Sequence, residues 1–148
     1  MKFVIQRVSK ASVSVGGEVI GAIDRGYMVL IGVSETDTEQ DADKLIAKML
    51  KLRIFEDAEG KTNLDLMTVG GNLLMISQFT LYADLKKGNR PSFVHAGSPE
   101  KARQLYEYIL ERCRNFRPDI QHGIFGEHME VSLINDGPFT ILLDSETI

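Results

Sequence analysis

The first third of the chain alternates apolar side chains with small or polar ones, in short runs separated by turn residues. Gly16-Gly17 and Asp24-Arg25-Gly26 are typical of tight turns. Runs of this length and period favour β-strands, because successive side chains of a strand point to opposite faces of a sheet. We therefore expect a meander of strands over residues 3–8, 11–15, 18–23 and 27–33.

Two later segments carry apolar residues at helical spacing. Thr36-Asp37-Thr38-Glu39 has a capping-box pattern, and Ser98-Pro99-Glu100 joins an N-cap serine to a proline at the first helical position. Each apolar stripe predicts a helix that packs one face against the rest of the protein. The stripes are Ala42, Leu45, Ile46, Met49 and Leu52 in the first helix, and Ala102, Leu105, Tyr106, Ile109 and Cys113 in the second.

Strand patterns return in the last third, at residues 120–125, 129–134 and 139–143, and Asn135-Asp136-Gly137-Pro138 interrupts them. The order of strands, helix, strands, helix and strands predicts an α+β fold. We expect a single domain over residues 1–148, in which a strongly curved, barrel-like and mostly antiparallel β-sheet carries two packed α-helices.

Composition narrows the class of protein. Of 148 residues, 43% are hydrophobic and 26% charged, as in ordinary globular proteins, and the net charge of −4 argues against a general nucleic-acid coat protein. The single Cys113 and the absence of a signal-peptide pattern predict a cytoplasmic protein without disulfides. No apolar run is long enough for a bilayer, so no membrane partner is expected. The three histidines lack ligand spacing, so we expect no metal and no other cofactor.

The stretch with the most chemical content follows an apolar run at residues 72–76. Ser77, Gln78, Phe79 and Thr80 place two hydroxyls and an amide beside an aromatic ring at the end of that predicted strand. Polar groups delivered by a rigid strand are what a binding site needs. The alternative is that Ser77 and Thr80 only satisfy backbone groups at a strand end. Both interpretations remain open at this level.

Other polar residues have two interpretations each. Arg7 in the first strand is either a charge on a solvent face or a donor fork that holds another backbone segment. Gly137-Pro138 is either an ordinary turn or a special backbone feature between strands. Lys86, Lys87 and Arg90 form either a solvated loop or contacts to phosphate. Arg112, Arg114 and Arg117 could contact phosphate, but we prefer a favourable interaction with the dipole at the helix C-terminus. For Cys113 we prefer a packed thiol to a nucleophile.

Taken together, several segments resemble the D-aminoacyl-tRNA deacylase (D-tyrosyl-tRNA(Tyr) deacylase) family. The resemblance runs in order from Met1 to about Leu143, and its most specific motifs are Ser77-Gln78-Phe79-Thr80 and Gly137-Pro138. The other matching segments are 6–8 with 11–13, 53–55, 81–83, 88–93 and 131–140. The chain departs from the usual pattern at Phe139, at Glu127-His128 and, more loosely, at 62–66.

The resemblance implies an enzyme that hydrolyses the ester between a D-amino acid and the 3′-terminal ribose of tRNA, and that also removes glycine from non-cognate tRNA. It implies a homodimer with active sites at the interface. A cis Gly137-Pro138 would reach into the partner's pocket at Ser77–Thr80 and exclude L side chains, and Arg7 would hold that segment. Phe125 and Met129 would line a pocket for the terminal adenine.

The resemblance leaves the chemistry open between two routes. Thr80 as nucleophile would need an adjacent base, for which His95 is the only candidate. The route we favour has backbone N–H groups near Phe79 and Thr80 as an oxyanion hole, with water activated by the 2′-OH of the tRNA. Two other functions are weighed against the deacylase: a non-catalytic nucleic-acid-binding module of the same fold, and a Ser/Thr esterase of small substrates.

Overall fold

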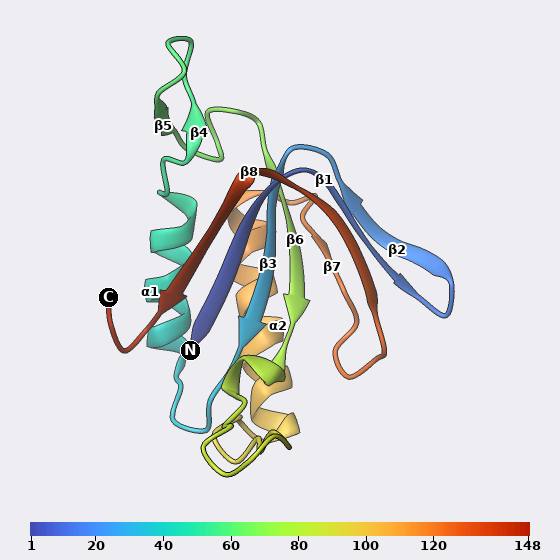
Figure 1. Ribbon diagram of the computed structural model, residues 1–148. Helices are drawn as coiled ribbons and strands as arrows, with labels where there is room; N and C mark the ends of the chain where they lie inside the picture. The colour runs from blue at the N-terminus through green and yellow to red at the C-terminus, as the bar shows by residue number, and fades with distance from the viewer.

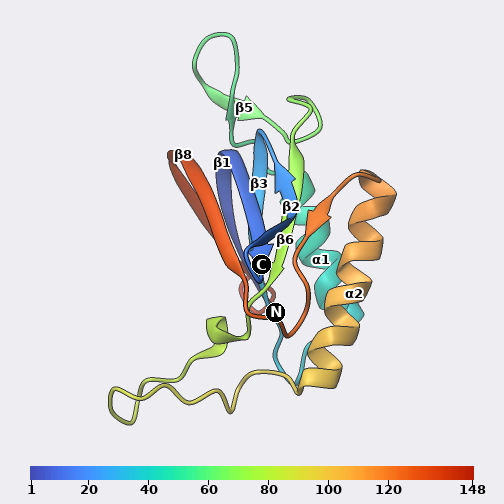
Figure 2. The same cartoon turned by 90° about the vertical axis from the view of Figure 1, so that its right-hand side faces the viewer.

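Six strands form one strongly curved sheet, and two helices cover one of its faces in the computed structural model, which describes residues 1–148 (Figures 1 and 2). A separate two-stranded hairpin extends from one end of the molecule. The sheet strands are β1 (Lys2–Val15), β2 (Glu18–Ile23), β3 (Gly26–Gly32), β6 (Asn72–Ser77), β7 (Gln121–His122) and β8 (Glu130–Asp144). The other elements are α1 (Glu39–Leu50), the hairpin β4 (Phe55–Glu56) and β5 (Thr62–Leu64), the 3₁₀ turn η1 (Phe79–Tyr82) and α2 (Pro99–Phe116).

The sheet is built around β1, which pairs antiparallel with β2, β3 and β8. β6 then pairs parallel with β3, and β7 pairs parallel with β6. Pairing with three partners is possible because β1 is long and curls, so that β2 bonds its far half while β3 bonds its near half. The predicted α+β fold, with a curved and mostly antiparallel sheet, is confirmed.

Strand boundaries differ from the predictions in three places. The expected strands at 3–8 and 11–15 are one continuous β1, and those at 129–134 and 139–143 are one β8 that bends at residues 135–138. β8 stays paired with β1 on both sides of the bend because shifts in register near Val8 absorb the extra residues. The strand expected at 120–125 is only the two residues of β7.

Both predicted helices are present, with one correction at a cap. The N-cap of α1 is Thr38, whose hydroxyl accepts from the amide of Asp41 while the Asp41 carboxylate accepts from the Thr38 amide. The capping box therefore lies two residues later than the predicted Thr36–Glu39 pair, and the acid at the fourth position is aspartate. α2 begins at Pro99 after Ser98, as predicted.

Neither α1 nor α2 combines the length and the apolar character required to cross a lipid bilayer.

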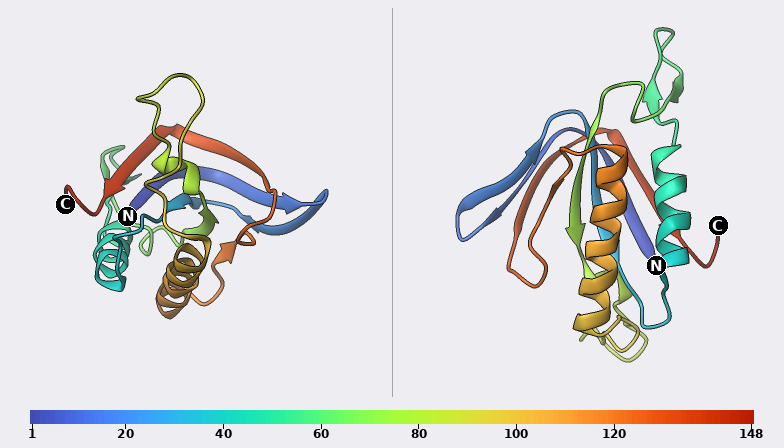
Figure 3. Two further views of the ribbon diagram at one scale, coloured as in Figure 1. Left: turned by 90° about the horizontal axis from the view of Figure 1, so that it is seen from below. Right: turned by 180° about the vertical axis from the view of Figure 1, so that it is seen from behind.

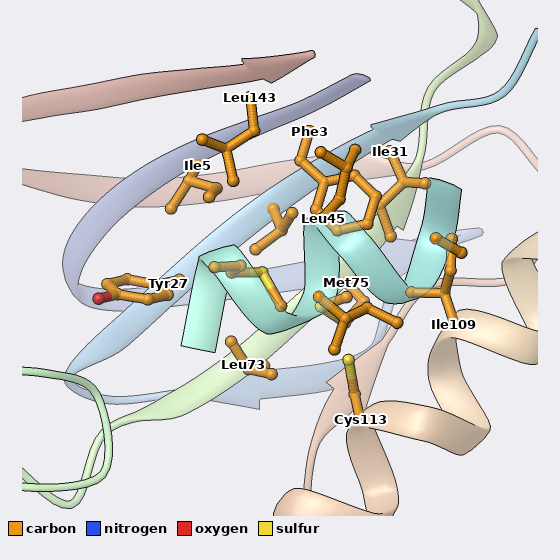
Figure 4. Close-up of a cluster of buried hydrophobic side chains, with 14 of the residues drawn as sticks. Phe3, Ile5, Tyr27, Ile31, Leu45, Leu73, Met75, Ile109, Cys113 and Leu143 are labelled. Atoms are coloured by element: carbon orange, nitrogen blue, oxygen red, sulfur yellow. The ribbon is translucent and has the colours of Figure 1, made fainter. Parts of the chain in front are cut away.

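The main core lies between the helices and the covered face of the sheet (Figure 4). Leu45 of α1 packs over Phe3 and Ile31, and Cys113 of α2 lies beside Met75 of β6. Burying each such aliphatic or aromatic side chain contributes about 1.5–3 kcal/mol. A second apolar cluster lies on the other face, inside the curl of the sheet: Val8, Ala11, Val13, Ile23, Met28, Leu74 and Ile76. The two clusters explain why β6 reads as a continuous apolar run.

The parallel junction of β3 and β6 depends on the absence of a side chain at Gly26. A Cβ atom built at Gly26 would lie 1.9 Å from the carbonyl oxygen of Asn72, far inside van der Waals contact. Only glycine therefore allows the two strands to start side by side.

We expect Gly26→Ala to lower the free energy of unfolding by at least about 3 kcal/mol, because two backbones must separate. Gly16→Ala is the matched control: no atom lies within 4 Å of its Cβ position. At Gly16 the only expected cost is about 1 kcal/mol, because alanine is less stable than glycine in the left-handed backbone conformation. Urea denaturation followed by circular dichroism measures both, and equal losses would contradict this account of the junction.

Candidate functional site

A cavity of about 820 Å³ opens at the carboxyl end of β6. Its walls come from the ends of β3 and β6, the first turns of α2 and the segment between β7 and β8. Twelve of its 21 lining residues are hydrophobic and a smaller number are polar, which is the usual composition of a small-ligand site. The predicted residues that line it are Ser77, Gln78, Phe79, Phe125 and Met129.

Ser77–Thr80 take their positions from the sheet. The amide of Gln78 donates to the carbonyl of Ile31 at 2.7 Å, which extends the parallel ladder by one residue beyond β6. The chain then enters η1, whose first bond is donated by the amide of Leu81 to the carbonyl of Gln78. The amides of Phe79 and Thr80 precede that bond, so they have no acceptor within the turn. The Gln78 side-chain amide donates to the Thr80 hydroxyl.

Aromatic side chains form the apolar walls of the cavity. The ring of Phe79 meets that of Phe93 edge-on at 4.9 Å, and Phe125 lies 6.1 Å from Tyr106, measured between ring centroids. The Tyr106 hydroxyl donates to the carbonyl of Met75 at 2.9 Å, which ties α2 to β6 behind the cavity. Phe79 is half exposed, so the cavity mouth presents an open aromatic surface.

The basic residues Lys86, Lys87 and Arg90 lie on an exposed loop, between Ala83 and Gly97, that projects past the sheet on the side away from the helices (Figures 2 and 3). A bridge between Asp84 and Ser92 closes the base of its tip. His95 lies in the same loop, with Nε2 at 3.4 Å from the Asp84 carboxylate. His95 forms no hydrogen bond with Thr80.

Arg7 is buried, so the solvent-face interpretation of this residue is wrong. Its Nε donates to the carbonyl of Asp136 at 2.8 Å, and its Nη1 donates to the carbonyl of Ile54 at 2.6 Å. The guanidinium also stacks on the Phe139 ring, 4.8 Å from the ring centroid. The bend of β8 is thus held from below by a rigid fork of donors. The unusual Phe139 is accommodated because its ring packs against this cation.

Gly137 and Pro138 lie exposed at the top of this bend. The Gly137-Pro138 bond is cis, as the resemblance implies. Gly137 has φ of +145°, and a Cβ there would lie 2.9 Å from the Phe139 amide nitrogen, so no other residue fits. The Asn135 side chain accepts from that amide at 2.6 Å and closes the turn.

Within one chain the two motifs lie apart. Arg7, beneath the bend, pairs with Tyr27 of β3, whereas Ser77 pairs with Ile31. Four residues of a strand span about 13 Å, so Gly137-Pro138 and Ser77–Thr80 lie near opposite ends of β3. Arg7, Gly137 and Pro138 are accordingly absent from the cavity wall of their own chain, and Thr80, which directly follows Phe79, does not line the cavity either.

No group of three or more His, Cys, Asp or Glu side chains is arranged to hold a metal ion. The acidic turn at 56–61 uses its oxygens internally, since Asp57 accepts from the amides of Glu59 and Lys61. Burial raises the pKa of the Cys113 thiol to about 12, which agrees with a packed, unreactive thiol.

Comparisons with known proteins agree over nearly the whole chain. The model of the D-Tyr-tRNA(Tyr) deacylase family matches residues 4–144. The D-aminoacyl-tRNA deacylase of Thermosipho melanesiensis is 50% identical, over 100% of this chain and 99% of the relative. That of Symbiobacterium thermophilum is 52% identical, over 99% and 97%. The chain belongs to the D-Tyr-tRNA(Tyr) deacylase family.

Two solved structures are similar to this chain over nearly its whole length. A c-Myc DNA Unwinding Element Binding Protein is 46% identical with a TM-score of 0.92, covering 97% of this chain and 98% of that one. A probable eukaryotic D-amino acid tRNA deacylase is 18% identical with a TM-score of 0.81, covering 96% and 97%, and supports the fold alone.

Sequence reasoning missed parts of the cavity that the family fold assembles from distant segments. Phe93 and Tyr106 line the cavity, yet one lies in the charged loop and the other on the buried stripe of α2. Neither has a local pattern that distinguishes a site residue from a core residue. Asn135 carried a usable signal, because an Asx residue before Gly-Pro often bonds the backbone of its own turn.

We expect Arg7→Gln to destabilise the protein by about 2–4 kcal/mol, because the buried carbonyl of Ile54 and the partly buried carbonyl of Asp136 lose their donors and the Asp136 carboxylate loses its ion pair. Arg112→Gln is the control, since Arg112 forms an exposed ion pair with Asp43 and its loss costs about 0–1 kcal/mol. Urea denaturation of both variants measures the difference. A similarly small decrease in the free energy of unfolding of both variants would show that Arg7 does not hold the bend.

Proposed function

We propose that this protein hydrolyses the ester bond of D-aminoacyl-tRNA, releasing the free D-amino acid and tRNA. The observation that carries the proposal is that Ser77, Gln78 and Phe79 line a mostly apolar cavity of about 820 Å³, in a chain that belongs to this family. Curated relatives about half identical over the full length are named D-aminoacyl-tRNA deacylase. Such a substrate belongs to translation, and hence to the cytoplasm.

In the proposed chemistry the RNA supplies the group that activates water. The amides of Phe79 and Thr80, which have no acceptor within η1, would donate to the developing oxyanion. Thr80 orients the substrate and does not attack it, because its hydroxyl is bonded to the Gln78 amide and no base contacts it. His95 is a poor base for Thr80, because its ring faces Asp84. The 2′-OH beside the ester is then the group best placed to direct the water.

Rejection of L-aminoacyl esters is assigned to the Gly137-Pro138 backbone of a second subunit. An L and a D ester have the same atoms, so only a rigid shape distinguishes them, and backbone is harder to displace than a side chain. Support comes from the rigid setting of the bend, which Arg7 and Asn135 hold by two hydrogen bonds, while a third anchors Arg7 to the carbonyl of Ile54. A filter of this kind admits glycine, which has no side chain, so we include glycyl-tRNA among the substrates.

The dimer follows from the separation of the two motifs within one chain, about 13 Å along β3. If Gly137-Pro138 acts on a substrate at Ser77–Thr80, a second copy must supply it. An apolar row supports such contact: Leu142, Val4 and Leu30 lie side by side on three neighbouring strands, on the face away from the helices. Leu142 is 60% exposed and adjoins the partly exposed Val4, and a contiguous apolar surface of this kind marks an interaction site.

The tRNA end is assigned to two regions. Phe125 and Met129 line the part of the cavity that would take the terminal adenine, where an aromatic ring and a thioether suit a flat base. Lys86, Lys87 and Arg90 are exposed on the loop that follows η1 and would contact phosphates. A loop that is free of ion pairs at these three side chains keeps its charges available.

We expect the wild-type protein to hydrolyse D-tyrosyl-tRNA at least about 100-fold faster than L-tyrosyl-tRNA, because the L side chain meets a rigid backbone.

Thr80→Ala should lower kcat/KM for the D ester by less than about tenfold, whereas loss of a nucleophile typically lowers the rate by a factor on the order of 10⁴ or more. Release of radiolabelled tyrosine measures both rates.

Other outcomes identify the competing functions. No turnover of the D ester, with tRNA or DNA bound, would favour the binding module, to which the name of the 46%-identical unwinding-element-binding protein also points. Equal turnover of a small D-tyrosine ester would favour the general esterase. A loss of about 10⁴ in Thr80→Ala, with tRNA still bound, would make Thr80 the nucleophile.

We expect Leu142→Lys to convert the protein from a species of twice the 16.5 kDa chain mass to a monomer, and to abolish D-ester hydrolysis with the fold retained. Val19→Lys is the matched control, because Val19 is equally exposed, at 60%, but lies on β2. Sedimentation equilibrium and circular dichroism measure mass and fold. A wild-type monomer that still discriminates D from L would overturn the shared site.

A further inference from the structure

A second cavity, of about 280 Å³, lies between α2 and the segment that follows β7. It shares two walls, Tyr106 and Phe125, with the large cavity, so the two spaces adjoin on either side of these aromatic side chains. The proposed function does not use this second cavity. Its polar lining is unusual for so small a cavity, because it contains Arg103, Arg114 and His122.

The two arginines of this cavity differ from the others near the end of α2. Arg112 pairs with Asp43, and Arg117 pairs with Asp119. Arg103 and Arg114 have no carboxylate within 4 Å: the Arg103 guanidinium lies over the Phe125 ring, 4.9 Å from the centroid, and Arg114 contacts only His122. Their remaining N–H groups are therefore available to an anion.

His122 fixes the position of Arg114. Its Nδ1 lies 2.7 Å from the carbonyl oxygen of Gly123, which can only accept, so Nδ1 carries the proton. Nε2 then accepts from Nη2 of Arg114 at 2.9 Å. One edge of the guanidinium is held by this bond, and the rest faces the cavity. His122 is thus a positioning residue for Arg114.

We propose that this cavity binds the phosphodiester that precedes the terminal adenosine of the tRNA. The proposal rests on the proposed function, since it takes the large cavity as the site of that adenosine. The lining carries two arginines and a histidine around a space of about 280 Å³, and guanidinium groups bind phosphate through paired N–H donors. A strand leaving the adenosine across Phe125 reaches Arg103 and then Arg114.

Glu107 is the one acidic residue that lines the cavity, and it opposes an anion there. Removing its charge should therefore strengthen phosphate binding, while removing that of Arg114 should weaken it. Opposite effects from two exposed residues on the same face of one helix are difficult to obtain from a change in folding alone.

The experiment compares two D-tyrosyl esters, of full-length tRNA and of adenosine without a 5′-phosphate. In Arg114→Gln, kcat/KM for the tRNA ester should fall about tenfold more than that for the adenosine ester. The slope of log KM against log salt for the tRNA ester should fall by about 0.7, the value for one phosphate of a single strand. Arg114→Lys should retain that slope, and Glu107→Gln should lower KM for the tRNA ester.

Arg112→Gln is the control, because it removes the same charge from the same helix at a residue that is already paired with Asp43. It should change neither the ratio of kcat/KM between the two esters nor the slope of log KM against log salt. An equal effect of Arg114→Gln on both esters, or an unchanged salt slope, would overturn the phosphate site. If the wild type hydrolyses neither ester, the proposed function fails. The phosphate site is then tested by itself with an RNA minihelix that ends in CCA and carries no amino acid. Its dissociation constant is compared with that of the same minihelix without the last two nucleotides.

Discussion

The backbone pairing of β1 with three other strands is the constraint on which the remaining structure depends. A strand of 14 residues can satisfy three partners only by curling, and that curl carries the bend of β8 over Arg7. The same pairing sets the register of β3, and β3 in turn positions β6 and the turn at Phe79–Tyr82. Both motifs of the candidate site are therefore placed by one strand, at opposite ends of its neighbour β3.

The bend of β8 is held in place by a buried arginine, Arg7. Taking a guanidinium out of water is costly unless its donors are used, and Arg7 uses them on two backbone carbonyls and an aromatic face. The carbonyl of Ile54 belongs to the start of the β4–β5 hairpin, and that of Asp136 belongs to the bend. One side chain thus links the bend to the rest of the fold, which keeps an exposed, glycine-containing turn in a single conformation.

Most of the fold could be predicted from the sequence, because local patterns determine it. Period-2 runs identified the strands of the first third, and Ser98-Pro99 marked the start of α2. The errors fall where long-range pairing overrides a local break: Asn135–Pro138 reads as the end of a strand, yet β1 continues to bond both sides. The shift of the α1 cap from Thr36 to Thr38 is of the same kind, because Asp37 is turned inward to accept from the amide of Ser34.

The candidate site was predictable only in part, and the reason is spatial. Ser77–Phe79 could be found because polar residues follow an apolar strand, whereas Phe93 and Tyr106 join them only through folding. For the arginines of α2, too, the fold and not the local sequence decides which side chains are available to a ligand. In sequence Arg103, Arg112, Arg114 and Arg117 are equivalent, but the fold neutralises two of them with aspartates and leaves two beside an aromatic wall. In a protein of net charge −4, such selective pairing concentrates the free positive charge where an RNA end would enter and leaves little elsewhere on that helix to bind nucleic acid without specificity.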